Sequence, residues 1–308
     1  MRFRFQPWQL AALLILVCGG AISGVYFYKT SGGNSPAALS SYLPLGEGAL
    51  VYIDVDALRR SGILDLIAGK KASEELEYQS FVDETKFDYR DDLDAVAALF
   101  KNDQVFMALR GRFNWKSLMA YAAHHGGSCQ NGFCEVAGSK PDRKISFYPI
   151  KPDLMALAVS RDGWAAFQIA HKSGRLPIVP PTQPVWAVLA GPALRNVSGL
   201  PAGTQSFAST LQTADRMVFT VGERDDHFEL AVDVTCENSD KASTLLNQLQ
   251  STTDTLRRWL DREHKQPNPA DVSGPLSAGS FRRDDRQVFG AWPVQRSFIE
   301  AMAGGSDR

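Results

Sequence analysis

Alternating apolar and polar residues predict β-strands along much of the chain. Residues 94–111 (DAVAALFKNDQVFMALRG) predict two strands joined by a polar turn. Residues 216–234 (RMVFTVGERDDHFELAVDV) predict a second hairpin of the same kind. A helical pattern follows each hairpin, at residues 115–125 and at residues 239–263. Hairpins and helices in this order predict an α+β fold built on antiparallel sheets.

The order of elements occurs twice, which predicts a duplication. Residues 50–62 (LVYIDVDALRRSG) and residues 186–199 (WAVLAGPALRNVSG) share one layout, and each copy continues with a hairpin, a helix, a closing strand and a short helix. We predict a first α+β repeat at 43–175, a connector at 176–184 and a second α+β repeat at 185–305. The predicted fold class is therefore α+β, a duplicated antiparallel-sheet unit with helices packed on one face. The pattern leaves open whether the two repeats share one sheet.

Residues 8–28 (WQLAALLILVCGGAISGVYFY) contain no charged residue. A helix of that length spans about 30 Å, the thickness of the hydrocarbon core of a bilayer. Arg2 and Arg4 precede the run, and positively charged residues stay on the cytoplasmic side of a membrane. The pattern predicts a cytoplasmic stub and transmembrane anchor at 1–29 and a linker at 30–42. The rest of the chain is then periplasmic, held at the bacterial inner membrane.

Two other fates of this segment stay open. Ala21-Ile22-Ser23 has the small residues of a signal-peptide cleavage site, and Cys18 stands where a bacterial lipoprotein is lipidated. Trp8 at one end and residues 26–28 (YFY) at the other are typical of the aromatic belts of a retained anchor. The apolar run also continues past the cleavage candidate, which favours retention.

Composition and charge narrow the class of protein. The chain has 308 residues, of which 44% are hydrophobic and 22% are charged, as in an ordinary globular protein. The length that follows the anchor is enough for one large domain or two ordinary domains. With 33 basic and 34 acidic residues, no net field favours nucleic acid, so we expect no nucleic-acid partner.

Cys129 and Cys134 flank Asn131-Gly132, the strongest signal for a two-residue hairpin turn. In such a hairpin the two cysteines face each other at a non-hydrogen-bonded pair, with Cα atoms about 4.5 Å apart. That distance fits a disulfide, which an oxidising compartment favours. We therefore predict a structural disulfide between Cys129 and Cys134.

A metal site formed by His124, His125, Cys129 and Cys134 is the alternative for these cysteines. The spacing is not that of a C-x-x-C site, and adjacent histidines point in different directions, so we predict no metal ligands. Cys236 lies in an alternating apolar run and is interpreted as a buried free thiol.

Clustered carboxylates are the other candidates for chemistry. Asp54 and Asp56 have the spacing of a hard-cation site, but Asp56 directly precedes a helical turn, and we predict that it is the helix N-cap. A further acidic group is interpreted as a solvated loop; it comprises Glu84, Asp88, Asp91, Asp92 and Asp94.

The tryptophans after the anchor lie in apolar patterns and are interpreted as core or inter-repeat packing, whereas several of them exposed in one groove would indicate a ligand site. No nucleophile motif and no phosphate loop occurs in the sequence. We therefore predict no catalytic residues, no cofactor and no enzymatic activity.

The segment YIDVDAL after Leu43-Pro44, the repeated hairpin-helix units and the anchor resemble uncharacterised bacterial membrane-anchored proteins with an extracytoplasmic domain. The resemblance implies a cell-envelope protein and carries no functional residue across. The predicted function is a membrane-tethered, non-enzymatic extracytoplasmic module that binds a ligand or an envelope protein. Alternatives are a carrier of an apolar small molecule or lipid between sheet and helices, and an envelope enzyme.

Overall fold

The computed structural model describes residues 35–66, 76–101, 103–138, 140–171, 176, 178–190, 214–224 and 227–304. The predicted anchor at 1–29 lies outside these residues. Among the helices that are described, none has both the length and the apolar character needed to cross a membrane.

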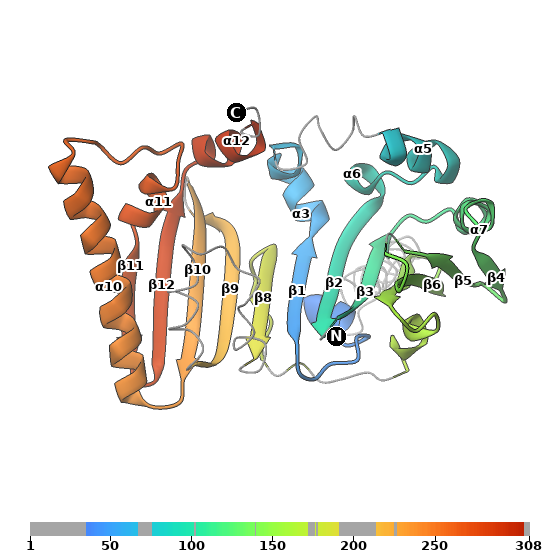
Figure 1. Cartoon of the computed structure of the whole chain (residues 1–308), viewed down its shortest axis with the longest axis horizontal. Coiled ribbons are helices and arrows are strands. Elements are labelled where there is room, and N and C mark those ends of the chain that lie inside the picture. Colours follow the sequence, from blue (N-terminus) through green and yellow to red (C-terminus); the bar gives the residue numbers. More distant parts are fainter. Residues whose placement is uncertain are drawn as a thin grey trace, which may run out of the picture.

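The described strands form one antiparallel sheet, so the prediction of an α+β fold on antiparallel strands is confirmed. Twelve strands lie side by side in the order β11-β12-β10-β9-β8-β1-β2-β3-β7-β6-β5-β4 (Figure 1). Their bounds are β1 Ala49–Asp54, β2 Leu93–Lys101, β3 Gln104–Gly111, β4 Ser128–Gln130, β5 Phe133–Ala137, β6 Lys144–Lys151, β7 Leu154–Ser160, β8 Val185–Ala190, β9 Ala214–Arg224, β10 His227–Cys236, β11 Ser280–Asp284 and β12 Gln287–Val294.

Helices follow the strands where the 3.6-residue pattern predicts them, at Trp115–His124 (α7) and Ser239–Arg262 (α10). Both begin after an asparagine whose side chain accepts a hydrogen bond from the first turn, Asn114 for α7 and Asn238 for α10. The remaining described helices are α2 Pro36–Ser40, α3 Val55–Arg60, α5 Leu76–Thr85, α6 Tyr89–Asp92, η1 Ala165–Gln168, α11 Ser273–Ser277 and α12 Arg296–Gly304.

A central pair of strands joins the two parts of the sheet. β1 pairs with β8, with Leu50 opposite Val188 and Tyr52 opposite Trp186. Outward from this pair the order is β1-β2-β3-β7 on one side and β8-β9-β10-β12 on the other. We call the strands β1 to β7 the first half and the strands β8 to β12 the second half. The question that the sequence left open is answered, because the halves share one continuous sheet.

The two faces of the sheet are packed differently. On the face that carries Tyr52, here called the Tyr52 face, the first half holds the largest core, in which Tyr52 stacks on Trp186 with ring centroids 5.3 Å apart. The short elements α2 and η1 cover it through Leu39 and Ala166. Burial of each large side chain in such a core contributes about 1.5–3 kcal/mol.

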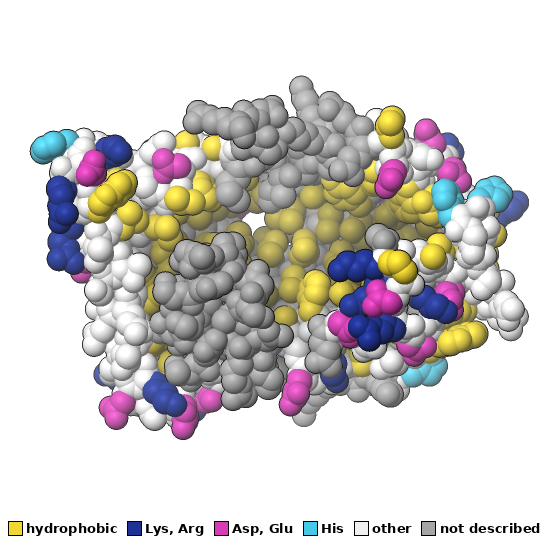
Figure 2. All heavy atoms as spheres, in the orientation of Figure 1, with side chains coloured by type: hydrophobic (Ala, Val, Ile, Leu, Met, Phe, Trp, Pro, Cys, Tyr) yellow, Lys and Arg dark blue, Asp and Glu magenta, His cyan; other side chains and the backbone are white. Residues whose placement is uncertain are grey.

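The longer helices cover the opposite face. α10 packs on the apolar side chains of β10 and β12, and α7 packs on those of β5, β6 and β7. The prediction that all helices pack on one face is therefore wrong in the first half. The reason is visible in β7, whose sequence LMALAVS is apolar at nearly every position, so that both of its faces require a cover. In the view of Figure 2, apolar side chains also gather over the central strands.

Candidate functional site

A cavity of about 940 Å³ lies on the second half of the sheet. That volume is at the upper end of the range of small-molecule sites. Strands β9, β10, β11 and β12 supply most of its wall, and the connector supplies Ile178, Val179 and Pro181. The strand residues that line it are Arg216, Val218, Thr220, Glu229, Ala231, Val232, Asp233, Ser280, Phe281, Arg282, Phe289, Gly290 and Ala291.

Strand register places most of these side chains on the Tyr52 face. Trp186 on β8 is opposite Tyr52 and opposite Thr220, and Thr220 is opposite Ala231. Because side chains alternate along a strand, every second residue of β9 and β10 then lies on the same face. Val218 on β9 and Asp233 on β10 are the next pair in this series. The cavity therefore continues the face on which the first half carries its core.

The cavity combines apolar and charged side chains. Burial raises the pKa of the Asp233 carboxyl, and the guanidinium groups of Arg216 and Arg282 act against that rise. Its Oδ1 atom is buried and accepts no hydrogen bond from another described residue. Arg216 Nη2 donates to Thr235 Oγ1 at 3.3 Å, and the Arg282 guanidinium lies 3.9 Å from the centroid of the Phe289 ring. An acceptor without a donor, next to two positioned cations, suits a polar ligand.

The first half has different residues at the equivalent positions. Two positions are equivalent here when they lie the same number of strands from the central pair, counted through directly opposed residues, with Tyr52 equivalent to Val188. Ala108 on β3 takes the place of Asp233 on β10, since Ala108 is two strands from Tyr52 and Asp233 is two strands from Val188. Phe106 likewise takes the place of Ala231. Ala108 and Phe106 are 0% and 1% exposed. One half therefore fills this face with core, and the other opens it into a cavity.

The predicted disulfide is present. Cys129 and Cys134 are bonded across the β4–β5 hairpin, with Cα atoms 4.1 Å apart. Asn131 and Gly132 have φ values of 51° and 82°, the left-handed conformations that a type I′ turn requires. Cys236 is buried and free, as predicted, and burial raises the pKa of its thiol.

The residues of the alternative metal site serve other contacts. His124 Nδ1 lies 3.9 Å and His125 Nε2 lies 3.4 Å from the Glu84 carboxylate, and both cysteines are consumed by the disulfide. Within the described ranges, no three His, Cys, Asp or Glu side chains gather as a metal site would require.

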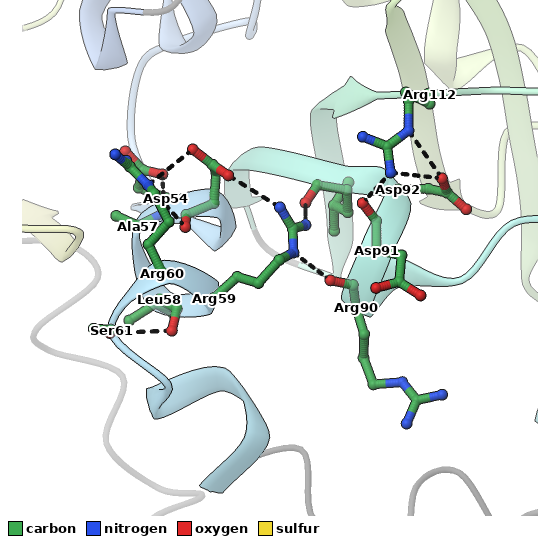
Figure 3. Close-up of polar contacts among 12 residues, drawn as sticks. Asp54, Ala57, Leu58, Arg59, Arg60, Ser61, Arg90, Asp91, Asp92 and Arg112 are labelled. Atoms are coloured by element: carbon green, nitrogen blue, oxygen red, sulfur yellow. Dashed lines mark hydrogen bonds and ion pairs between the residues drawn. The ribbon is translucent and has the colours of Figure 1, made fainter.

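Asp54, and not Asp56, is the helix N-cap, so this prediction is wrong by two residues. The Asp54 side chain accepts a hydrogen bond of 2.8 Å from the Ala57 backbone N–H (Figure 3). The helix begins at Val55, because this valine buries its side chain beside Leu58 and starts the helix directly after the strand. Asp56 lies in the first turn and pairs with Arg59 and Arg60 at 3.0 and 3.2 Å.

The predicted solvated acidic loop is instead an ordered network. Asp88 accepts hydrogen bonds from Tyr78 Oη at 2.8 Å and from Arg90 Nη2 at 2.7 Å, and it caps α6. These donors lower the pKa of Asp88 to about 2. Asp92 pairs with Arg112 at 3.1 Å (Figure 3). Arg112 lies far from Asp92 in the sequence, so the run of acidic residues alone could not predict this ion pair.

The described tryptophans differ in burial, and Trp115 is half-buried. Trp186 and Trp292 are buried, as the apolar patterns predict, whereas Trp164 and Trp259 are 56% and 47% exposed. The residues that line the cavity were missed, because arginine and aspartate at alternate strand positions have the pattern of an ordinary solvated face.

No protein-family model matches the chain, and no curated protein matches its sequence. Among solved structures, crystal form I of TP0453 matches 88% of this chain and 97% of that chain, with a TM-score of 0.50 and 11% sequence identity. Crystal form III of TP0453 matches 86% of this chain and 96% of that chain, with a TM-score of 0.45 and 9% sequence identity. The first likeness shows a similar fold and nothing of activity. The resemblance to bacterial membrane-anchored proteins stays a prediction.

Proposed function

We propose that this protein is a membrane-tethered binding module of the cell envelope that holds a small molecule in the cavity of its second half. The cavity carries the proposal, because it replaces packed core by Arg216, Asp233 and Arg282 beside apolar wall residues. A buried carboxylate oxygen without a donor costs stability, so a function at this place accounts for Asp233 better than packing does.

The lining favours an amphipathic ligand. Val218, Ala231 and Phe289 offer apolar contact, and Arg216 and Arg282 offer cations to an acidic group. A donor on the ligand would satisfy the unpaired Asp233 oxygen. A carrier of a wholly apolar lipid, the runner-up function, fits less well because such a ligand would leave the buried Asp233 oxygen without a donor. Both arginines already contact a neighbour, which suits binding better than the proton transfers of an enzyme.

We further infer that the two halves are copies of one α+β unit. The register of the central strands supports duplication. If the two halves are interchanged, the pair Leu50–Val188 takes the place of the pair Tyr52–Trp186, and the reverse. On this view the copies diverged at one face, and the second copy acquired the ligand site.

Placement in the envelope rests on two observations. Residues 8–28 are uncharged and long enough to span a bilayer, and the Cys129–Cys134 bond is of the kind that persists in oxidising compartments. Fractionation with protease accessibility and thiol labelling tests it. We expect a membrane-bound body that is cleaved only from the outer side, with two thiols protected until reduction. A soluble cytoplasmic chain with free thiols would contradict this placement.

Native mass spectrometry of the full chain, purified from its membranes and released from micelles, tests ligand binding. We expect a non-covalent small-molecule adduct on the wild type that is lost in Ala231→Phe, which installs the ring that the first half carries at this place. Gln248→Phe adds the same ring to the exposed side of α10 and should retain the adduct. An adduct that survives in Ala231→Phe, or a wild type without an adduct, would contradict the proposal.

A further inference from the structure

Three aromatic rings are stacked at the far end of the first half, remote in the sheet order from the cavity strands. Phe133 on β5 lies 4.8 Å from Trp164 and 4.4 Å from Phe167, measured between ring centroids, and all three planes lie within 12° of parallel. Phe133 is 6% exposed, whereas Trp164 and Phe167 are 56% and 39% exposed. We call Trp164 and Phe167 the aromatic platform.

One face of the Trp164 ring is open to solvent. Its other face stacks on the buried Phe133, and 56% of Trp164 is exposed, so the exposed part includes the outer face of the ring. Phe167 also stacks on Phe133 and is 39% exposed, and its plane lies 7° from that of Trp164 with the centroids 5.6 Å apart. The platform therefore presents two nearly parallel, partly exposed rings.

The backbone beneath the platform is fixed by hydrogen bonds. Asp162 Oδ1 accepts from the Trp164 backbone N–H at 2.9 Å, and Ser146 Oγ accepts from the Ala166 N–H at 3.2 Å. Tyr148 Oη donates to the Ile169 carbonyl at 2.7 Å. The platform is held in place before any partner arrives, which lowers the entropy lost on binding.

Polar groups border the platform on one side. A Cβ atom at Gly163, the neighbour of Trp164, would lie 2.0 Å from Glu135 Oε2, so the absence of a side chain there lets the Glu135 carboxylate lie beside the platform. Lys144 Nζ is 2.7 Å from Glu135 Oε1. This pair offers a hydrogen-bond acceptor and a donor, and the pair has no net charge.

We propose that the aromatic platform is a second binding site, and that it takes the pyranose rings of a β-1,4-linked glycan chain. Such rings have flat C–H faces, which pack on the electron-rich faces of aromatic rings, and hydroxyl groups at their edges that the Glu135–Lys144 pair can bind. An anionic partner would call for a positive border, which the Glu135–Lys144 pair does not provide. The site is independent of the cavity and of its ligand.

Saturation-transfer NMR of the full chain in a sugar-free detergent, with the tetramer of N-acetylglucosamine as probe, tests this site. We expect transfer to the ring C–H protons of the tetramer and at least tenfold weaker binding by Trp164→Ala. Trp259→Ala removes another exposed tryptophan and should bind the probe like the wild type. Trp164→Phe keeps a ring face and should restore part of the binding. Ala231→Phe should have no effect, which separates this result from the test of the cavity.

Three outcomes would overturn the proposal. They are no transfer to the tetramer in the wild type, equal transfer in Trp164→Ala, and fluorescence quenching by brominated phosphatidylcholine that is stronger in the wild type than in Trp164→Ala, in vesicles that hold the full chain. The last outcome would assign the platform to the membrane surface. Circular dichroism of Trp164→Ala checks that the fold persists, as expected for a side chain that is 56% exposed.

Discussion

The first four strands outward from the centre follow the same order in both halves, β1-β2-β3-β7 and β8-β9-β10-β12, yet the halves use one face in opposite ways. In the first half, Phe106 and Ala108 are buried under α2 and η1. In the second half, Ala231 and Asp233 at the corresponding places line a cavity. The comparison teaches that strand order can be kept while the side chains of one face change from packing to binding.

The sharpest way to break this contrast is to move the charge of the cavity into the core. Ala108→Asp should destabilise the protein by about 3–5 kcal/mol, because the new carboxylate has no partner in a fully buried site. Urea unfolding followed by circular dichroism measures the loss. Ala108→Val adds volume without charge and is the control. A cost below about 1 kcal/mol for Ala108→Asp would mean that the first half tolerates a charge as the second half does.

A second test addresses the ion-paired segment that borders the first half. Asp88→Asn should cost about 2 kcal/mol at pH 7, since the pKa of Asp88 falls from 3.8 to about 2 on folding and its side chain is 16% exposed. A lowered pKa stabilises the fold above pH 4, and the contribution is lost as the pH falls to about 2. Denaturant midpoints of both proteins should converge near pH 2, and a gap that is constant from pH 7 to pH 2 would refute the mechanism.

The Cys129–Cys134 hairpin belongs to the part of the first half that has no counterpart among the described strands of the second. Cys129→Ser with Cys134→Ser should cost about 1–2 kcal/mol, because the bond closes a short loop with a sequence separation of 5. Thermal unfolding with and without reductant measures it. Reductant should shift the wild type and leave the double variant unchanged.

The reciprocal exchange should have the smallest effect and the opposite sign. Asp233→Ala should stabilise the protein by about 1 kcal/mol at pH 7, because it removes an unsatisfied buried acceptor. Burial raises the pKa of Asp233 in the folded protein. Wild-type stability therefore falls as the pH rises above the pKa that this carboxyl has in the unfolded chain. The gain should therefore vanish below pH 4. A destabilised variant at pH 7 would show that Asp233 supports the fold.

The local pattern of the chain predicted the hairpins at 94–111 and 216–234, the helices α7 and α10, and the disulfide, because each depends on neighbours in sequence. The cavity could not be predicted, since Arg216 and Arg282 meet only through strand register. The aromatic platform was also hidden, because Phe133 and Trp164 are brought together by the sheet and have no shared pattern. The helix cap was predicted two residues too late, at Asp56 and not at Asp54, because the helix already begins at the buried Val55.

The strands at the two ends of the sheet affect how readily the protein aggregates with other chains. Among the described strands, β4 and β11 are the two at the ends of the sheet, where backbone groups are not paired with a further described strand. β4 has 3 residues, and β11 has 5 residues with Arg282, Arg283 and Asp284 among them. Short or charged borders resist the addition of foreign strands. The described sheet can therefore be long without ending in strands that favour aggregation.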